Sequence, residues 1–187
     1  MSRVGVLALQ GDVREHLRLL GDLGVEAIPV KRPEELDIVD ALVIPGGEST
    51  TIGKMAVRFG LLEPLKERLS AGLPVYGTCA GMILLACNLT EGDQPLIGVL
   101  DVVVKRNAFG RQNESFEADL EIAGLDEPFH AVFIRAPWIE KVGSEVEVLS
   151  SVGEHAVMVR HGNIMATSFH PELTGDGRIH QMLLDLI

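Results

Sequence analysis

The stretch PVYGTCAGMILLA, residues 74–86, decides the fold. Its first residues, 74–76, form a short apolar segment that predicts a buried strand, and its last residues form an apolar run that predicts a helix. Between the two stands Gly-Thr-Cys-Ala-Gly, residues 77–81. A strand that enters Gly-x-Cys-x-Gly and then a helix has the pattern of a nucleophile elbow, with cysteine at the position of the nucleophile. The stretch therefore predicts a strand–turn–helix unit that presents Cys79 at the edge of a sheet.

The residues around Cys79 suit a reactive thiol. Small neighbours let the backbone close around a strained central residue. The N-terminus of the following helix stabilises a thiolate, and the backbone N–H of Ala80 is placed to face an oxyanion. The alternative is a buried structural cysteine at a tight turn, because free cysteine is among the most buried residue types. Cys87 lacks the flanking glycines and lies in the apolar run, so it is predicted to be a core residue of the helix.

The pattern on either side of this unit predicts an α/β fold. Strands are predicted at 4–9, 25–30 and 41–44, helices at 12–24 and 61–71, and a short helical or turn segment at 33–40. Such alternation indicates a mostly parallel central sheet flanked by helices on both faces. The second half has strands with few helices between them, at 99–104, 115–122, 131–135, 145–151, 156–160 and 164–169, before a closing helix at 174–187. We therefore expect an additional antiparallel, strand-rich second half, and one domain over residues 1–187, because no linker or repeat interrupts the chain.

Composition excludes several classes of protein. The 187 residues include 16 basic and 27 acidic side chains, a net charge of −11, and 47% of the residues are hydrophobic. The hydrophobic content excludes a disordered or fibrous chain. Nucleic acids and anionic membranes attract basic surfaces, so neither is an expected partner. Two cysteines make no disulfide framework, and no segment is long enough for a signal peptide or a membrane span, so we expect a protein of the cytoplasm.

A cysteine nucleophile needs a base, and the base needs a group that orients it. His170 follows the predicted strand 164–169 and leads into Pro171-Glu172. In an extended chain, residues two apart point to the same side, so Glu172 is predicted to lie beside the imidazole of His170. The remaining histidines are expected to face solvent: His16, His130, His155, His161 and His180.

The glycine turn PGGEST, residues 45–50, follows the third predicted strand and precedes a helix. It resembles a phosphate-binding loop, but the spacing of the Walker A motif is absent, and so is the dinucleotide fingerprint G-x-G-x-x-G. Glycine permits close approach, so the turn is suited to donate a backbone N–H to an oxyanion. Ser49 and Thr50 are also predicted to cap the helix that follows.

With these three motifs, the chain resembles the class I, or triad, glutamine amidotransferases. Within them it is most similar to the branch of glutaminase subunits of pyridoxal 5′-phosphate synthases. The resemblance covers nearly the whole chain, and it rests on GVLALQG (5–11) with REH (14–16), PGGESTT (45–51), GTCAG (77–81), RNAFGRQ (106–112) with SFE (115–117), FIRAP (133–137) and SFHPELT (168–174). The cysteine elbow and His-Pro-Glu are common to triad glutaminases, whereas GGEST, FGRQ and FIRAP are more specific to the vitamin B6 branch.

The resemblance implies a role for each residue of the motifs. Cys79 attacks the side-chain amide of L-glutamine, His170 moves the proton, and Glu172 orients His170. The backbone amides of Gly47 and Ala80 form the oxyanion hole. The substrate pocket is implied to contain Gly47, Glu48, Ser49, Arg106, Ile134 and Arg135. The arginines are the cations that an α-carboxylate requires, and Glu48 is suited to an α-ammonium.

The resemblance also implies partners. The products are L-glutamate and ammonia, and the ammonia passes to a synthase subunit, while no cofactor and no metal are expected. Arg111 is assigned no firm role, since its loop could serve partner contact. Two other interpretations remain open: a triad glutaminase that serves another pathway, such as histidine or nucleotide synthesis, and a non-enzymatic module with a reactive, redox-sensing cysteine.

Overall fold

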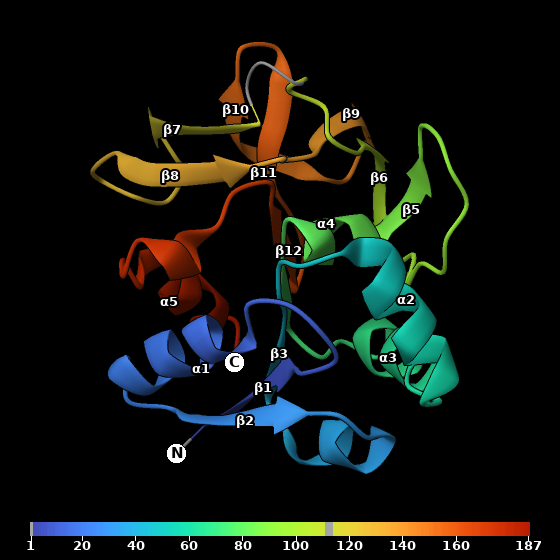
Figure 1. The fold of residues 1–187 in the computed structure, drawn as a ribbon. Helices are drawn as coiled ribbons and strands as arrows, with labels where there is room; N and C mark the ends of the chain where they lie inside the picture. The colour runs from blue at the N-terminus through green and yellow to red at the C-terminus, as the bar shows by residue number, and fades with distance from the viewer. Residues whose placement is uncertain (1, 111–113) are drawn as a thin grey trace.

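The structure, a computed structural model, describes residues 2–110 and 114–187 (Figure 1). Arg111 lies outside the described residues. The first half alternates strands and helices: β1 (Arg3–Leu7), α1 (Val13–Asp22), β2 (Glu26–Val30), η1 (Pro33–Ile38, a 3-10 helix), β3 (Ala41–Ile44), α2 (Ser49–Arg58), α3 (Leu62–Ser70), β4 (Val75–Thr78) and α4 (Ala80–Leu85). The second half is richer in strands: β5 (Ala86–Leu89), β6 (Leu100–Lys105), β7 (Ser115–Leu120), β8 (Phe129–Ile134), β9 (Trp138–Val142), β10 (Glu147–Val152), β11 (His155–His161) and β12 (Ile164–Thr167), followed by η3 (Pro171–Leu173) and α5 (Arg178–Leu184).

The described strands form one large sheet and one hairpin. The large sheet has the order β2-β1-β3-β4-β12-β11-β9-β6-β5, and β10 pairs with β11 at its side. From β2 to β12 all pairs are parallel, whereas β12–β11, β11–β9, β9–β6 and β11–β10 are antiparallel. Strands β7 and β8 form a separate antiparallel pair. The expectation of an α/β fold with a parallel sheet and an antiparallel second half is confirmed.

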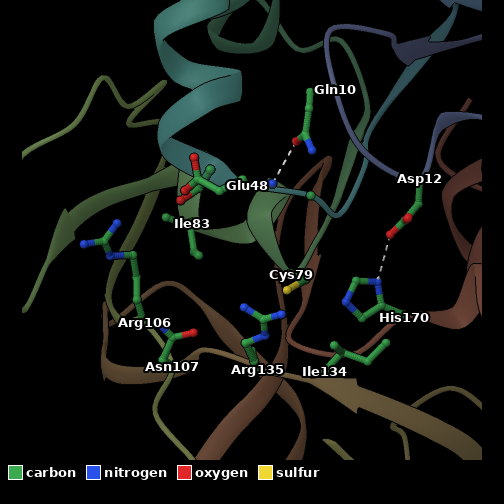
Figure 2. Close-up of a pocket in the computed structure, with 12 residues that line it drawn as sticks. Gln10, Asp12, Glu48, Cys79, Ile83, Arg106, Asn107, Ile134, Arg135 and His170 are labelled. Atoms are coloured by element: carbon green, nitrogen blue, oxygen red, sulfur yellow. Dashed lines mark hydrogen bonds and ion pairs between the residues drawn. The ribbon is translucent and has the colours of Figure 1, made fainter. Parts of the chain in front are cut away.

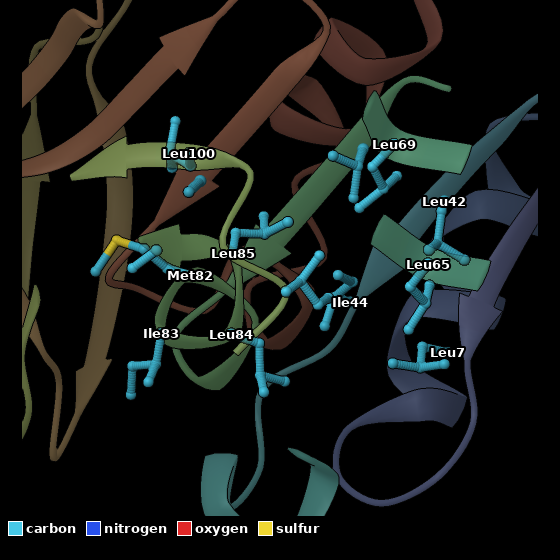
Figure 3. Close-up of a cluster of buried hydrophobic side chains, with 14 of the residues drawn as sticks. Leu7, Leu42, Ile44, Leu65, Leu69, Met82, Ile83, Leu84, Leu85 and Leu100 are labelled. Atoms are coloured by element: carbon cyan, nitrogen blue, oxygen red, sulfur yellow. The ribbon is translucent and has the colours of Figure 1, made fainter. Parts of the chain in front are cut away.

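Each face of the parallel sheet is covered by a different set of helices (Figure 1). Side chains of a strand alternate between the faces. On β3, Leu42 and Ile44 pack with residues of α2, α3 and α4, while Ala41 and Val43 pack with residues of α1 and α5. Figure 3 shows the first of these clusters, in which Leu65 of α3 approaches the strands. The parallel part is thus a three-layer unit that fixes the carboxyl ends of β1, β3, β4 and β12 close together.

Several predicted boundaries differ from the structure. Strands β5 and β9 were not predicted, and the closing helix is α5, which is much shorter than 174–187 because a turn occupies residues 174–177. Cys87 is exposed and lies on β5, so its assignment to the core of a helix is wrong. The reason is that α4 ends at Leu85, and the chain then pairs with β6 as a strand. In the described part of the chain, no helix has the length and apolar character that crossing a bilayer requires.

Candidate active site

Cys79 stands in a sharp turn between β4 and α4. Its φ of 50° and ψ of −100° lie in a region that non-glycine residues rarely adopt. The two flanking glycines make the turn possible, because a Cβ on Gly77 would lie 2.7 Å from the backbone of Gly81, and one on Gly81 would lie 2.1 Å from the carbonyl oxygen of Ile44. The Cys79 N–H donates to the carbonyl of Thr167 on β12 (2.7 Å). The elbow is thus locked between two neighbouring strands.

His170 and Glu172 lie side by side, as the sequence predicts. His170 Nδ1 is 2.6 Å from Glu172 Oε1, and both side chains are buried. The backbone is not extended there, because Glu172 belongs to the 3-10 helix η3. The predicted neighbour relation therefore arises from a tight turn after Pro171 rather than from a strand. Since Nδ1 faces the carboxylate, the other ring nitrogen is left for Cys79, whose sulfur lies near the His170 ring in Figure 2.

A second carboxylate approaches His170. Asp12 Oδ2 is 3.5 Å from His170 Nδ1, and Asp12 comes from the turn before α1. Burial by itself would lower the pKa of His170, but contacts with Asp12, Cys79 and Glu172 outweigh it and raise the pKa to about 12. Burial raises the pKa of Glu172, and its hydrogen bond to His170 opposes that shift. The imidazole is accordingly held as an imidazolium between acidic groups.

Gly46 lets the loop after β3 close onto this histidine. A Cβ at position 46 would lie 2.5 Å from His170 Cε1 and 3.0 Å from Asp12 Oδ2. No side chain fits in that space without displacing the ring. The loop that carries Gly47 and Glu48 is therefore seated directly against His170.

A cavity of about 470 Å³ opens over Cys79 (Figure 2). Gly47, Glu48, Ser49, Arg106, Ile134 and Arg135, the six predicted substrate-binding residues, all line it together with Cys79 and His170. Its lining also includes four residues that the sequence interpretation did not assign to the pocket: Gln10, Asp12, Ile83 and Asn107. Ala80 is buried beside Cys79 as the first residue of α4, and Glu172 lies behind His170.

Glu48 shapes the rim of the cavity. Its backbone N–H donates to Gln10 Oε1 (2.8 Å), and its carboxylate accepts hydrogen bonds from the backbone of Thr50 and Thr51 at the start of α2. Glu48 is thus the helix cap, and the expectation that Ser49 and Thr50 serve as caps is wrong. Burial would raise the pKa of Glu48, but these hydrogen bonds lower it. The lowered pKa keeps the Glu48 carboxylate negatively charged at the rim of the cavity.

Gln94 connects two residues of the cavity wall, Ser49 and Arg106, with Thr50 at the start of α2. Its Oε1 accepts from Arg106 Nη1 (3.1 Å), Ser49 Oγ (3.0 Å) and Thr50 Oγ1 (3.3 Å). Arg106 Nε is buried and has no hydrogen-bond partner among the described residues. Arg135 is exposed and has a φ of 42°. The second half of the chain thus contributes the cations, and the first half contributes the nucleophile.

His16 and His180 are buried, so the expectation that they face solvent is wrong. His16 Nδ1 is 2.8 Å from His180 Nε2, and His16 Nε2 is 3.6 Å from Glu172 Oε2. A signal for both burials exists in the sequence. His16 lies three residues after Val13 and four before Leu20, on the apolar face of α1, and His180 lies three before Leu183.

Asp12, His170 and Glu172 together have the side-chain types that bind metal ions. One ligand atom each from Asp12, His170 and Glu172 lies within 4.8 Å of the others. The 2.6 Å contact between His170 Nδ1 and Glu172 Oε1 is a charge-assisted hydrogen bond, which accounts for their closeness.

Comparison with known proteins agrees with this geometry. The model of the SNO glutamine amidotransferase family matches residues 6–187. A protein of Mycobacteroides abscessus named pyridoxal 5′-phosphate synthase subunit PdxT is 61% identical, with 98% of this chain and 96% of that protein covered. A protein of the same name from a Nocardioides species is 59% identical over 98% of this chain and 95% of its own length. A crystal structure of a glutamine amidotransferase is 52% identical and superposes with a TM-score of 0.94, over 98% of this chain and 97% of that one. The chain belongs to the SNO glutamine amidotransferase family.

Proposed function

We propose that this chain is the glutaminase subunit of a pyridoxal 5′-phosphate synthase, and that residues 1–187 act as a single glutaminase domain. It releases ammonia from L-glutamine, and a synthase subunit receives the ammonia. The observation that carries the proposal is the alignment of Cys79, His170 and Glu172 beneath one cavity, with His170 Nδ1 2.6 Å from Glu172 Oε1. Relatives about 60% identical over nearly their whole length have the name of that subunit.

The reaction follows from the roles of these groups. Cys79 and His170 share one proton, which lies on the imidazole when the sulfur attacks the side-chain carbonyl carbon of glutamine. The backbone N–H groups of Gly47 and Ala80 stabilise the oxyanion of the tetrahedral intermediate. His170 then gives its proton to the amide nitrogen, ammonia leaves, and a thioester remains on Cys79. Water attacks the thioester with His170 as general base, which releases glutamate and restores the thiol. Glu172 orients His170 and stabilises the imidazolium.

The remaining residues of the cavity recognise the free amino acid. We assign the α-carboxylate to Arg106 and Arg135 and the α-ammonium to Glu48, because these are the charges that the cavity offers at its wall and rim. Ser49 and Ile134 complete the pocket. This assignment makes the site selective for a zwitterion with an amide side chain. We place the enzyme in the reducing cytoplasm, where the Cys79 thiol is preserved.

The decisive experiment measures glutamate release from L-glutamine by the wild type and by Cys79→Ala, each with and without the synthase subunit. We expect Cys79→Ala to lose activity, and we expect the wild type to be slow alone and faster with its partner, because ammonia released without an acceptor is wasted. A Cys79→Ala variant that keeps its activity would exclude the triad. Strong activity that the partner leaves unchanged would contradict the coupling.

A second measurement separates the glutaminase from a non-enzymatic module with a reactive cysteine. An electrophilic analogue of glutamine should alkylate Cys79 through the cavity and leave Cys87 unmodified, although Cys87 is the more exposed thiol. L-glutamine should protect Cys79. Labelling that follows exposure, with Cys87 modified first, would indicate no substrate recognition.

A further inference from the structure

The carboxylate of Glu172 is shared by two regions of the molecule. Its Oε1 contacts His170, whereas its Oε2 is buried and has no hydrogen-bond partner within the described ranges. A buried anionic oxygen without a donor is costly. His16 Nε2 faces this oxygen at 3.6 Å, and Thr78 Oγ1 lies 3.5 Å from the same nitrogen. The ring of His16 is thus the group that the fold places behind the catalytic carboxylate.

Behind His16 stands a second buried ring. His180 Nε2 is 2.8 Å from His16 Nδ1, and Tyr76 packs edge-on against the His180 ring with centroids 5.5 Å apart. Neither histidine has any exposed surface. Burial, together with the nearby rings of His180 and His170, keeps the pKa of His16 well below its ordinary value, and burial lowers the pKa of His180 to about 4. Both rings are therefore neutral at physiological pH, and each has a single N–H.

Hydrogen-bond accounting selects one arrangement of these two protons. If His16 carried its proton on Nδ1, its Nε2 lone pair would face the carboxylate of Glu172. His180 would then accept at Nε2, and its own N–H would be on Nδ1, which is buried and has no partner among the residues described. If both protons are on Nε2, His180 donates to His16 and His16 points its N–H at Glu172. The second arrangement points an N–H toward Oε2 and toward Thr78 Oγ1, and it avoids an unpaired N–H on His180 Nδ1.

We propose that His16 and His180 are positioning residues: a neutral relay, His180 Nε2–H to His16 Nδ1 and His16 Nε2–H toward Glu172 Oε2, that holds the carboxylate against His170. The distance of 3.6 Å makes the last contact electrostatic rather than a full hydrogen bond. The relay touches neither the cavity nor Cys79, so it acts through Glu172 alone. This role rests on the proposed glutaminase function, but the arrangement of protons does not.

The protons are tested directly on the full chain. Long-range proton–nitrogen NMR correlations of the histidine rings distinguish a ring protonated on Nε2 from one protonated on Nδ1. We expect the Nε2–H form for both His16 and His180, assigned by comparison with His16→Gln and His180→Gln. An Nδ1–H form at either position, or a doubly protonated ring at neutral pH, overturns the relay whether or not the chain hydrolyses glutamine.

The positioning role is tested by a matched pair of substitutions. In His16→Gln the amide nitrogen is reached through the same number of bonds as Nε2 of histidine, whereas in His16→Asn it reaches only the position of Nδ1. Both variants lose the ring, so both lose its packing. We expect kcat of the enzyme with its synthase partner to fall about tenfold or more in His16→Asn. KM for glutamine should stay within about twofold, and His16→Gln should recover most of the rate.

His161→Asn serves as the control, because His161 is half-exposed on β11 and borders a different cavity. Equal losses in His16→Asn and His16→Gln, or a rise in KM without a loss of kcat, would reduce His16 to a packing residue. Should neither variant fold, the NMR spectrum of the wild type still decides the relay, with each ring assigned through its bonds to the assigned backbone. A wild type without glutaminase activity defeats the proposed function and leaves the tautomers to be judged separately.

Discussion

Glu172 separates two regions that use histidine in opposite ways. On the cavity side, His170 lies among Asp12, Cys79 and Glu172, and these contacts raise its pKa to about 12 against the effect of burial. On the interior side, His16 and His180 lie against each other, with His16 also facing the far oxygen of Glu172, and burial lowers the pKa of both. The same side chain is a cation in one place and neutral a few ångströms away. Burial acts on all three rings, so the difference is made by the hydrogen bonds of His170 to Asp12, Cys79 and Glu172, whereas His16 meets Glu172 only at 3.6 Å.

The two sides also respond to pH in opposite directions. A raised pKa stabilises the folded state fully below the unfolded value of about 6.5, and this stabilisation is lost as the pH rises toward the folded value. A lowered pKa has the reverse effect: stability is lost as the pH falls below the unfolded value, because the unfolded chain binds a proton that the folded chain does not bind. The candidate site therefore combines a protonated histidine, His170, with two neutral ones, His16 and His180. Substitutions can change either side without changing the other.

Substitution of His170, the protonated histidine, should have the largest effect on activity. His170→Asn deletes the general base, so kcat for glutamine hydrolysis should fall about a hundredfold to ten-thousandfold. KM should change little, since the cavity wall with Arg106 and Glu48 is intact. Steady-state kinetics with the synthase partner present measures both constants. A variant within a factor of about ten of the wild type in kcat would show that another base acts in its place.

The space around the cation is tested by Gly46→Ala. The new methyl group would lie 2.5 Å from His170 Cε1, so the ring must move away from Glu172. We expect kcat to fall about tenfold or more, because a small misplacement of a catalytic group is costly.

Gly21→Ala is the matched control for that substitution. A Cβ on Gly21 meets nothing within 4 Å, and Gly21 lies inside α1. Activity should be unchanged, and stability should rise by about 0.5–1 kcal/mol, because alanine favours a helix interior. Equal activity of the two variants would contradict the close approach of the loop to His170.

The smallest effect concerns the neutral side. His180 has a folded-state pKa of about 4 and an ordinary value of 6.5, so the wild type should lose stability as the pH falls below about 6.5. Lowering the pH from about 7.5 to about 5.5 should cost about 1 kcal/mol through His180 alone. His180→Gln does not titrate, so its loss over the same interval should be smaller by that amount. Urea unfolding of both proteins at both pH values measures this difference. If the wild type and His180→Gln lost the same free energy of unfolding, His180 would be charged or exposed in the folded state.

The sequence was most informative where one short motif contains both the reactive residue and the residues that set its backbone conformation. Gly-x-Cys-x-Gly predicts the elbow because the close approach at Gly77 is local to β4 and α4, although Gly81 also makes room for the carbonyl of Ile44 on β3. His170 and Glu172 are neighbours in the chain, so their pairing was predictable, although their backbone was not. The parallel order of the first strands follows from the alternation of strands and helices.

What the sequence left open depends on contacts between distant segments. Asp12 follows β1 whereas His170 follows β12, so their contact depends on the packing of distant segments, and Gln94 reaches Ser49 and Arg106 from a loop with no regular pattern. His16 is polar on an apolar face, and a rule based on residue type alone assigns it to the surface. Cys87 shows the converse error, because the apolar run predicts a helix that continues through residue 87, whereas α4 ends at Leu85.

The contact between His16 and His180 joins residues 164 positions apart, near the two ends of the sequence. A ribosome makes the first long before the second, and Cys79 and its cavity wall emerge in between. The pair of rings behind Glu172 is complete only when α5 packs against α1, so the support of this carboxylate depends on a contact between an early and a late segment of the chain.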